Sequence, residues 1–129
     1  MHKTKRITFG GEENIRKGGD DAEKFRFSFS VVPANVIGQP EELNATTNHR
    51  ITVCVARSQS NTWKLSEAEL VKVLFWYAWR EVEKQAKAGA LKQDMMLNVK
   101  DQKCAFAPVS VPDHRGWSQE VDEQGKIGF

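Results

Sequence analysis

Hydrophobic and polar residues alternate strictly in two segments of the chain, and this alternation predicts two strands. In residues 24–31, phenylalanine or valine takes every second position, and lysine, arginine or serine takes the others. Residues 50–55 repeat the pattern, with Ile51, Val53 and Val55 separated by Arg50, Thr52 and Cys54. Because the side chains of a strand alternate between the two faces of a sheet, each segment has one apolar and one polar face. Both strands therefore belong to a sheet that is covered on one side.

A long amphipathic helix is predicted downstream of these strands, over residues 66–88. Ser66 and Glu69 have the spacing of a capping box, and Gly89 follows the last turn as a stop signal. At about 100° per residue, six apolar residues fall within one arc of roughly 140°, which is wide enough to pack on a sheet. These residues are Leu70, Val71, Leu74, Phe75, Ala78 and Val82.

Shorter apolar segments predict the other strands. Residues 6–9 precede the alternating pair, and two further strands, 95–99 and 104–111, follow the helix. We therefore expect an α+β fold with a single antiparallel sheet of about four to five strands, two or three before the helix and two after it. The helix is expected to lie across one face of this sheet.

One domain, residues 1–129, is expected from the length of the chain. Residues 10–23 are rich in glycine and in charged residues, which predicts a loop. Residues 1–5 and 113–129 are polar, and we expect them to be flexible tails or segments that cover a partner.

Composition narrows the choice of compartment and partner. Charged residues make up 28% of the chain, but the net charge is only +2, which argues against strong non-specific binding to nucleic acid. The start M-H-K-T-K-R-I-T-F has no apolar region of a secretory signal, and no apolar run is long enough to span a membrane. Cys54 and Cys104 are too few for a disulfide framework. We expect a cytoplasmic protein with no membrane contact.

Trp76 is the residue that the helix pattern does not explain. It falls at the centre of the charged side of the helix, and Trp79 borders the apolar arc. Three coverings of Trp76 are consistent with the sequence: another segment of the same chain, a second copy of the helix, or a foreign partner. The leading hypothesis is a small binding or assembly protein, a homodimer that uses the aromatic edge of the helix. The predicted interface consists of Lys72, Trp76, Trp79, Arg80 and Glu83.

Two alternative functions belong to other classes. The open face of the sheet, with Lys24, Arg26, Arg50 and Thr52, forms with the basic N-terminal arm a surface that could contact the phosphates of a nucleic acid. A small-molecule-binding protein or an enzyme would instead need a pocket between helix and sheet.

The sequence contains no recognisable catalytic, metal-ligand or phosphate-loop motif. We therefore assign no catalytic, cofactor-binding or metal-binding residue, expect no cofactor, and lean against an enzyme. The roles of His49 and His114 stay open, with a solvated loop position expected for His114.

Overall fold

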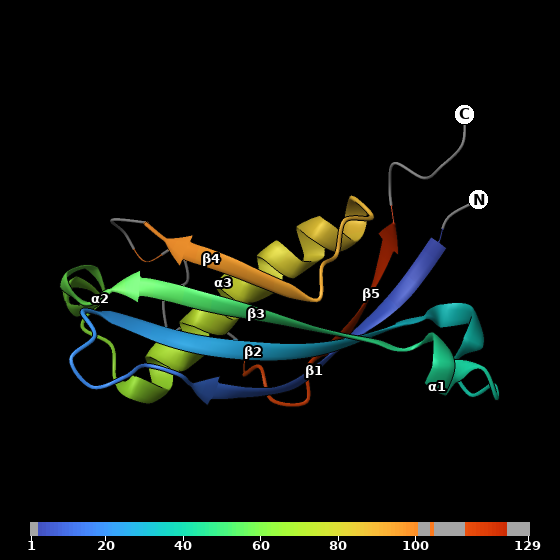
Figure 1. The fold of residues 1–129 in the computed structure, drawn as a ribbon, viewed down its shortest axis with the longest axis horizontal. Helices are drawn as coiled ribbons and strands as arrows, with labels where there is room; N and C mark the ends of the chain where they lie inside the picture. The colour runs from blue at the N-terminus through green and yellow to red at the C-terminus, as the bar shows by residue number, and fades with distance from the viewer. Residues whose placement is uncertain (1–2, 101–103, 105–112, 124–129) are drawn as a thin grey trace.

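One long helix packs against one face of a five-stranded sheet (Figure 1). The structure, a computed structural model, describes residues 3–100, 104 and 113–123. The strands are β1 (Lys3–Asn14), β2 (Ala22–Pro33), β3 (Thr47–Ala56), β4 (Asp94–Val99) and β5 (Ser118–Glu123). The long helix is α3 (Glu67–Lys87), and the connections contain η1 (Ala34–Val36), α1 (Glu42–Ala45) and α2 (Arg57–Trp63). The predicted α+β class, with one sheet and one long helix, is confirmed.

The strand order across the sheet is β4-β3-β2-β1-β5. The pairs β1–β2, β2–β3 and β1–β5 are antiparallel, whereas β3 and β4 are parallel, with Arg50 opposite Asp94. This parallel pair corrects the wholly antiparallel sheet that we had expected. Its cause is α3, which carries the chain back along the sheet before β4 begins, as a crossover helix does. In this strand order, β4 and β5 lie at opposite edges of the sheet.

Two segments with loop composition are part of the sheet. β1 continues through residues 10–14, after a shift in register between Phe9 and Gly11, and Gly11 has a φ of 135° that suits glycine. Residues 118–123, within the predicted C-terminal tail, pair with residues 3–8 as β5. Strand pairing overrides local composition in both cases, with the next strand along the chain for residues 10–14 and with a distant strand for residues 118–123. The predicted strand over residues 104–111 lies outside the described residues, except for Cys104, which is not in a strand.

Residues 57–63 form the short helix α2, although most of them are polar. The segment ends at Lys64, whose left-handed φ of 55° stops the helix. α2 has no apolar stripe of helical period, so its sequence gave no pattern that predicts a helix.

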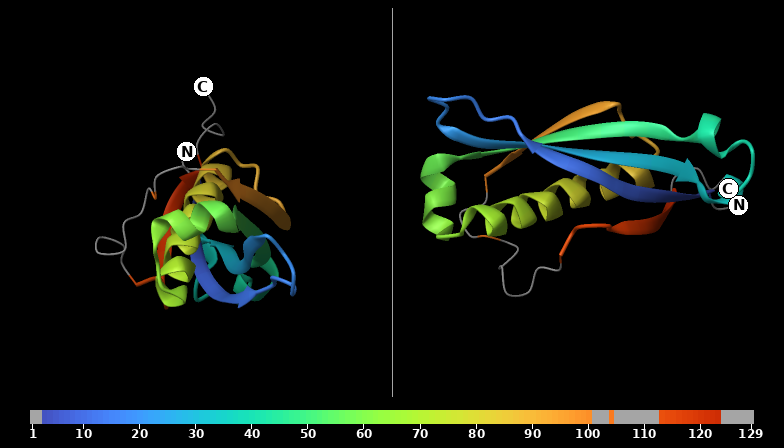
Figure 2. Two further views of the ribbon diagram at one scale, coloured as in Figure 1. Left: turned by 90° about the vertical axis from the view of Figure 1, so that its left-hand side faces the viewer. Right: turned by 90° about the horizontal axis from the view of Figure 1, so that it is seen from below.

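The core lies between α3 and the face of the sheet that carries the alternating apolar residues. Phe27, Ile51 and Val53 on the sheet and Leu74 and Phe75 on α3 have no exposed surface. The Phe75 ring contacts the rings of three sheet residues, with centroid distances of 4.9 Å to Phe9, 6.0 Å to Phe27 and 5.9 Å to Phe29. Figure 2 shows that α3 covers one face of the sheet and leaves the other open.

Ser66 caps α3 as the sequence predicts. Its side chain accepts a hydrogen bond from the Glu69 amide, and the Glu69 carboxylate accepts one from the Ser66 amide. The second bond stabilises the charged carboxylate, and it lowers the pKa of Glu69. The cap fixes where α3 begins, and thereby which side chains of the helix face the sheet.

Replacing Phe75 with alanine should lower the free energy of unfolding by about 3–5 kcal/mol, because a fully buried ring at the centre of the core is lost. Chemical denaturation followed by circular dichroism measures this change. The matched control is Leu43→Ala, since the Leu43 side chain is 85% exposed on α1; it should change stability by less than about 0.5 kcal/mol. An equal effect of the two substitutions would contradict the assignment of the core.

Candidate interaction site

The four residues predicted for the open face lie side by side on β2 and β3. Arg26 is directly opposite Thr52, and Lys24 and Arg50 are two positions away along their strands. They alternate with the buried phenylalanines and valines, so they occupy the face that α3 leaves open. The structure thus places Lys24, Arg26, Arg50 and Thr52 on one surface.

Each basic residue of this surface has an acidic partner from a neighbouring segment. Arg26 pairs with Glu13 at 3.1 Å, Arg50 with Asp94 at 3.0 Å, and Lys24 with Asp20 at 3.6 Å. These pairs are exposed, so each contributes little to stability. Their main consequence is electrostatic, because a phosphate backbone would meet balanced charge rather than a basic patch.

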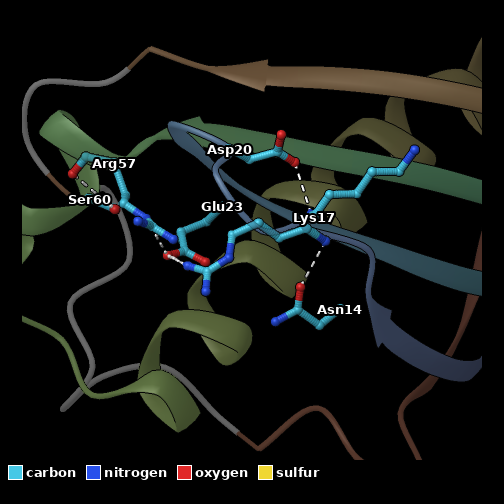
Figure 3. Close-up of polar contacts among 7 residues, drawn as sticks. Asn14, Lys17, Asp20, Glu23, Arg57 and Ser60 are labelled. Atoms are coloured by element: carbon cyan, nitrogen blue, oxygen red, sulfur yellow. Dashed lines mark hydrogen bonds and ion pairs between the residues drawn. The ribbon is translucent and has the colours of Figure 1, made fainter.

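A partly buried carboxylate joins the β1–β2 loop to α2 (Figure 3). The Glu23 carboxylate lies 3.0 Å from Arg16 Nη1 and 3.5 Å from Arg57 Nε, and its side chain is only 16% exposed. Ser60 donates to the backbone oxygen of Arg57, which holds the start of α2. A hollow of about 390 Å³ lies beside this cluster. Because Glu23 is shared by both guanidinium groups, we interpret the cluster as a structural clamp.

Segment 113–117 covers part of the aromatic edge of α3. The rings of Trp117 and Trp79 lie 3.9 Å apart, and Trp79 is 5% exposed. Trp117 also meets Trp76 edge-on at 6.1 Å, and Trp76 is partly buried against the core. Another segment of the same chain thus covers the indole of Trp79 and shields part of Trp76.

His114 fixes the same segment and is buried, contrary to the solvated loop position that we had expected. It is 5% exposed, and its ring stacks on Phe75 at 4.8 Å and meets Phe9 edge-on at 5.4 Å. Its Nε2 lies 3.2 Å from a carboxylate oxygen of Glu12 on β1. The sequence could not reveal this pair, because its members are 102 positions apart. Enclosed between two rings, the imidazole serves as an anchor for Trp117.

His49 also has a structural position. Its ring nitrogens lie 2.7 Å from the Thr47 hydroxyl and 2.7 Å from the backbone oxygen of Lys92. It ties the start of β3 to the segment before β4. Among the residues that the structure describes, no group of histidine, cysteine, aspartate and glutamate has the arrangement of a metal site. None of the described helices is long and apolar enough to cross a membrane.

The charged members of the predicted interface follow α3 toward β4. Glu83 pairs with Lys87 at 3.5 Å, and Arg80 is exposed. Lys72, one turn before Trp76, is partly buried. Arg80, Glu83 and Lys87 line a shallow groove of about 520 Å³ whose far wall is Leu97 on β4. The structure thus brings Arg80 and Glu83 beside β4, while the two tryptophans lie beside segment 113–117.

β4 presents an unpaired backbone edge in the described part of the chain. The Arg50 amide donates to the Gln93 carbonyl oxygen at 2.9 Å. Backbone groups in a ladder alternate in direction, so the N–H and C=O groups of Asp94, Met96 and Asn98 point away from β3. Met96 is 67% exposed, and Met95 and Leu97 are half-buried. Edge strands usually carry lysine, proline or a bulge that prevents pairing, and residues 94–99 contain none of these.

The opposite edge, β5, is acidic. Glu120, Asp122 and Glu123 lie within its six residues. Glu120 pairs with Arg6 on β1, and Asp122 accepts a hydrogen bond from Thr4. A second copy of β5 would bring carboxylates close to carboxylates, which disfavours pairing at this edge. The two edges of the sheet therefore differ in their capacity to accept another strand.

Replacing Trp117 with alanine should expose the Trp79 and Trp76 rings to water. We expect a red shift of tryptophan fluorescence and a loss of about 2–3 kcal/mol in the free energy of unfolding, less than for a fully buried tryptophan. The matched control is Arg115→Ala, in the same segment but with an 84% exposed side chain. Unchanged emission in the Trp117→Ala variant would show that other residues cover Trp79.

No protein family, curated protein or solved structure matches this chain at a significant level. A function for the chain is therefore inferred from its own residues and their geometry.

Proposed function

We propose that this chain is a small, non-enzymatic assembly protein that associates with a second copy of itself through β4 and the adjoining flank of α3. The observation that carries the proposal is the contrast between the two edges of the sheet. β4 combines outward backbone groups with the half-buried or exposed side chains of Met95, Met96 and Leu97, and β5 is acidic. Strand addition at an open edge uses such backbone groups for affinity and alternate side chains for specificity.

The flank of α3 supports this location of the interface. The groove between α3 and Leu97 is lined by both acidic and basic residues, among them Arg80, Glu83 and Lys84. Mixed charges beside apolar side chains, here those of β4, are typical of the polar rim around the core of an interface. The proposed interface therefore keeps Arg80 and Glu83 from the set predicted from the sequence. It replaces the tryptophans, which segment 113–117 covers in part, with the β4 edge.

The nucleic-acid alternative has less support from the geometry. Its candidate residues share one face, but Arg26, Arg50 and Lys24 are each paired with a carboxylate. The enzyme alternative requires an accessible pocket with a histidine and a carboxylate. In the pair that has this chemistry, the His114 imidazole is enclosed by aromatic rings and only Glu12 is exposed. These contacts favour the assembly function over both alternatives.

A cytoplasmic location is part of the proposal. Neither Cys54 nor Cys104 is in a disulfide, which suits a reducing compartment. Cys54 lies on the open face, and partial burial raises the pKa of its thiol, which keeps it in the protonated and less reactive form.

Replacing Asn98 with proline should abolish or strongly weaken self-association while the chain stays folded. The Asn98 N–H points to the open edge, so proline removes a group available to a partner without removing a bond to β3. Loss of this hydrogen bond in each of two copies should weaken the dimer at least about fivefold. Sedimentation equilibrium of the variant and the unmodified protein, over micromolar concentrations, measures the change.

Two controls separate this effect from a general effect of substitution. Asn98→Ala keeps the amide and should associate as the unmodified protein does. Glu120→Pro removes an outward amide from the opposite edge, because the Phe9–Trp117 hydrogen bond directs the odd-numbered residues of β5 toward β1. It should leave association unchanged. An unmodified protein that stays monomeric at tens of micromolar would overturn the proposed function.

A further inference from the structure

We infer that two copies pair β4 to β4 in an antiparallel register centred on Leu97, and that Asp94 and Lys100 determine this register. The inference rests on the proposed self-association and specifies how the two copies meet. In this register each Leu97 faces the Leu97 of the other copy. Asp94 then faces Lys100, Met95 faces Val99, and Met96 faces Asn98.

The direction of the backbone groups is the first support for this arrangement. Asp94, Met96 and Asn98 point their N–H and C=O groups to the open edge, and Lys100 is the next even-numbered residue, one position after β4 ends. In the inferred register these even-numbered residues meet one another, which places outward donors opposite outward acceptors. The two Leu97 residues form the central pair without mutual backbone hydrogen bonds, in which side chains come closest.

Charge is the second support. Asp94 is the first residue of β4, and Lys100 follows its last residue, Val99. The two side chains carry opposite charges. An antiparallel pair brings the beginning of one strand to the end of the other, so the twofold axis creates the Asp94–Lys100 contact twice. Nε and Nη2 of Arg50 both contact Oδ1 of Asp94, which leaves Oδ2 for the lysine of the second copy. A register shifted by two residues, centred on Met96, would place Asp94 opposite Asn98 and lose both ion pairs.

The same geometry limits the assembly to two copies. Within the described residues each chain offers one open β4 edge, and the twofold axis uses both edges at once, so the contact is closed. Two five-stranded sheets then join into one, with acidic β5 at each outer edge. The two α3 helices lie on the same face of the joined sheet, because opposite residues in the inferred register have the same parity along the strand.

A disulfide tests the register. In a background with Cys54→Ser and Cys104→Ser, Leu97→Cys should form an intermolecular disulfide under mild oxidation, since the two α carbons would be about 4.5 Å apart. Met95→Cys is the matched control on the same face of β4. Its two copies would be four positions apart along the strand, about 13 Å, and should not crosslink. Non-reducing gel electrophoresis and mass spectrometry report the product.

Three outcomes of this experiment are distinguishable. Crosslinking of Leu97→Cys alone supports the inferred register. Crosslinking of Met96→Cys in place of Leu97→Cys shows the register centred on Met96 and overturns the inference, while the proposed self-association stands. A dimer that Asn98→Pro disrupts, but in which neither cysteine crosslinks, also overturns the register alone. A monomeric unmodified protein overturns the proposed function and the inference together.

A charge exchange tests the roles of Asp94 and Lys100. Asp94→Lys and Lys100→Asp each place like charges opposite one another at both ends of the interface, so each variant alone should dimerise at least about fivefold more weakly. An equimolar mixture restores both opposite-charge pairs, and it should form a heterodimer about as stable as the unmodified dimer. Native mass spectrometry of the mixture distinguishes the species. A statistical distribution of homodimers and heterodimers would overturn the inference.

Discussion

The packing of α3 against the phenylalanine face of β2 is the interaction on which the rest of the structure depends. Phe75 occupies the centre of this contact, where rings from β1, β2, α3 and segment 113–117 meet. Because α3 must lie along this face, it carries the chain across the sheet and makes β4 parallel to β3. The same position of α3 leaves its aromatic edge to segment 113–117 and its charged flank to β4. The contact between α3 and the sheet thus determines what lies beside each flank of the helix, β4 on one side and segment 113–117 on the other.

Much of this arrangement could be predicted because local chemistry and tertiary structure agree. Strict alternation identified β2 and β3, and the capping box identified the first residue of α3 to within one position. Buried Leu74, Phe75 and Ala78 fall within the arc that helical periodicity predicts. Each of these signals arises from residues that are near one another in sequence.

What sequence could not provide depends on partners that are distant in the chain. Residues 118–123 form a strand because of their hydrogen bonds to β1 at the other end of the chain, not because of their own composition. The burial of His114 requires Glu12, Phe9 and Phe75, which no local pattern relates to it. The open edge at β4 was missed for the same reason, since an edge is a property of strand order. The position of Trp76 is unexplained as long as α3 is considered as an isolated helix, and Trp117 supplies part of its covering.

The pairing of β1 with β5 has a consequence for folding. Lys3 lies opposite Glu123, so this ladder closes a loop of almost the whole chain and contributes the contacts of highest sequence separation among the described residues. During synthesis, residues 3–99 can leave the ribosome and form the four-stranded part of the sheet with α3 before β5 emerges. Until residues 113–123 follow, β1 is an open edge and the Trp79 indole is uncovered, which are the features that promote aggregation of a nascent chain. Segment 113–123 therefore does more than complete the native sheet, since its arrival ends the interval in which the chain is vulnerable.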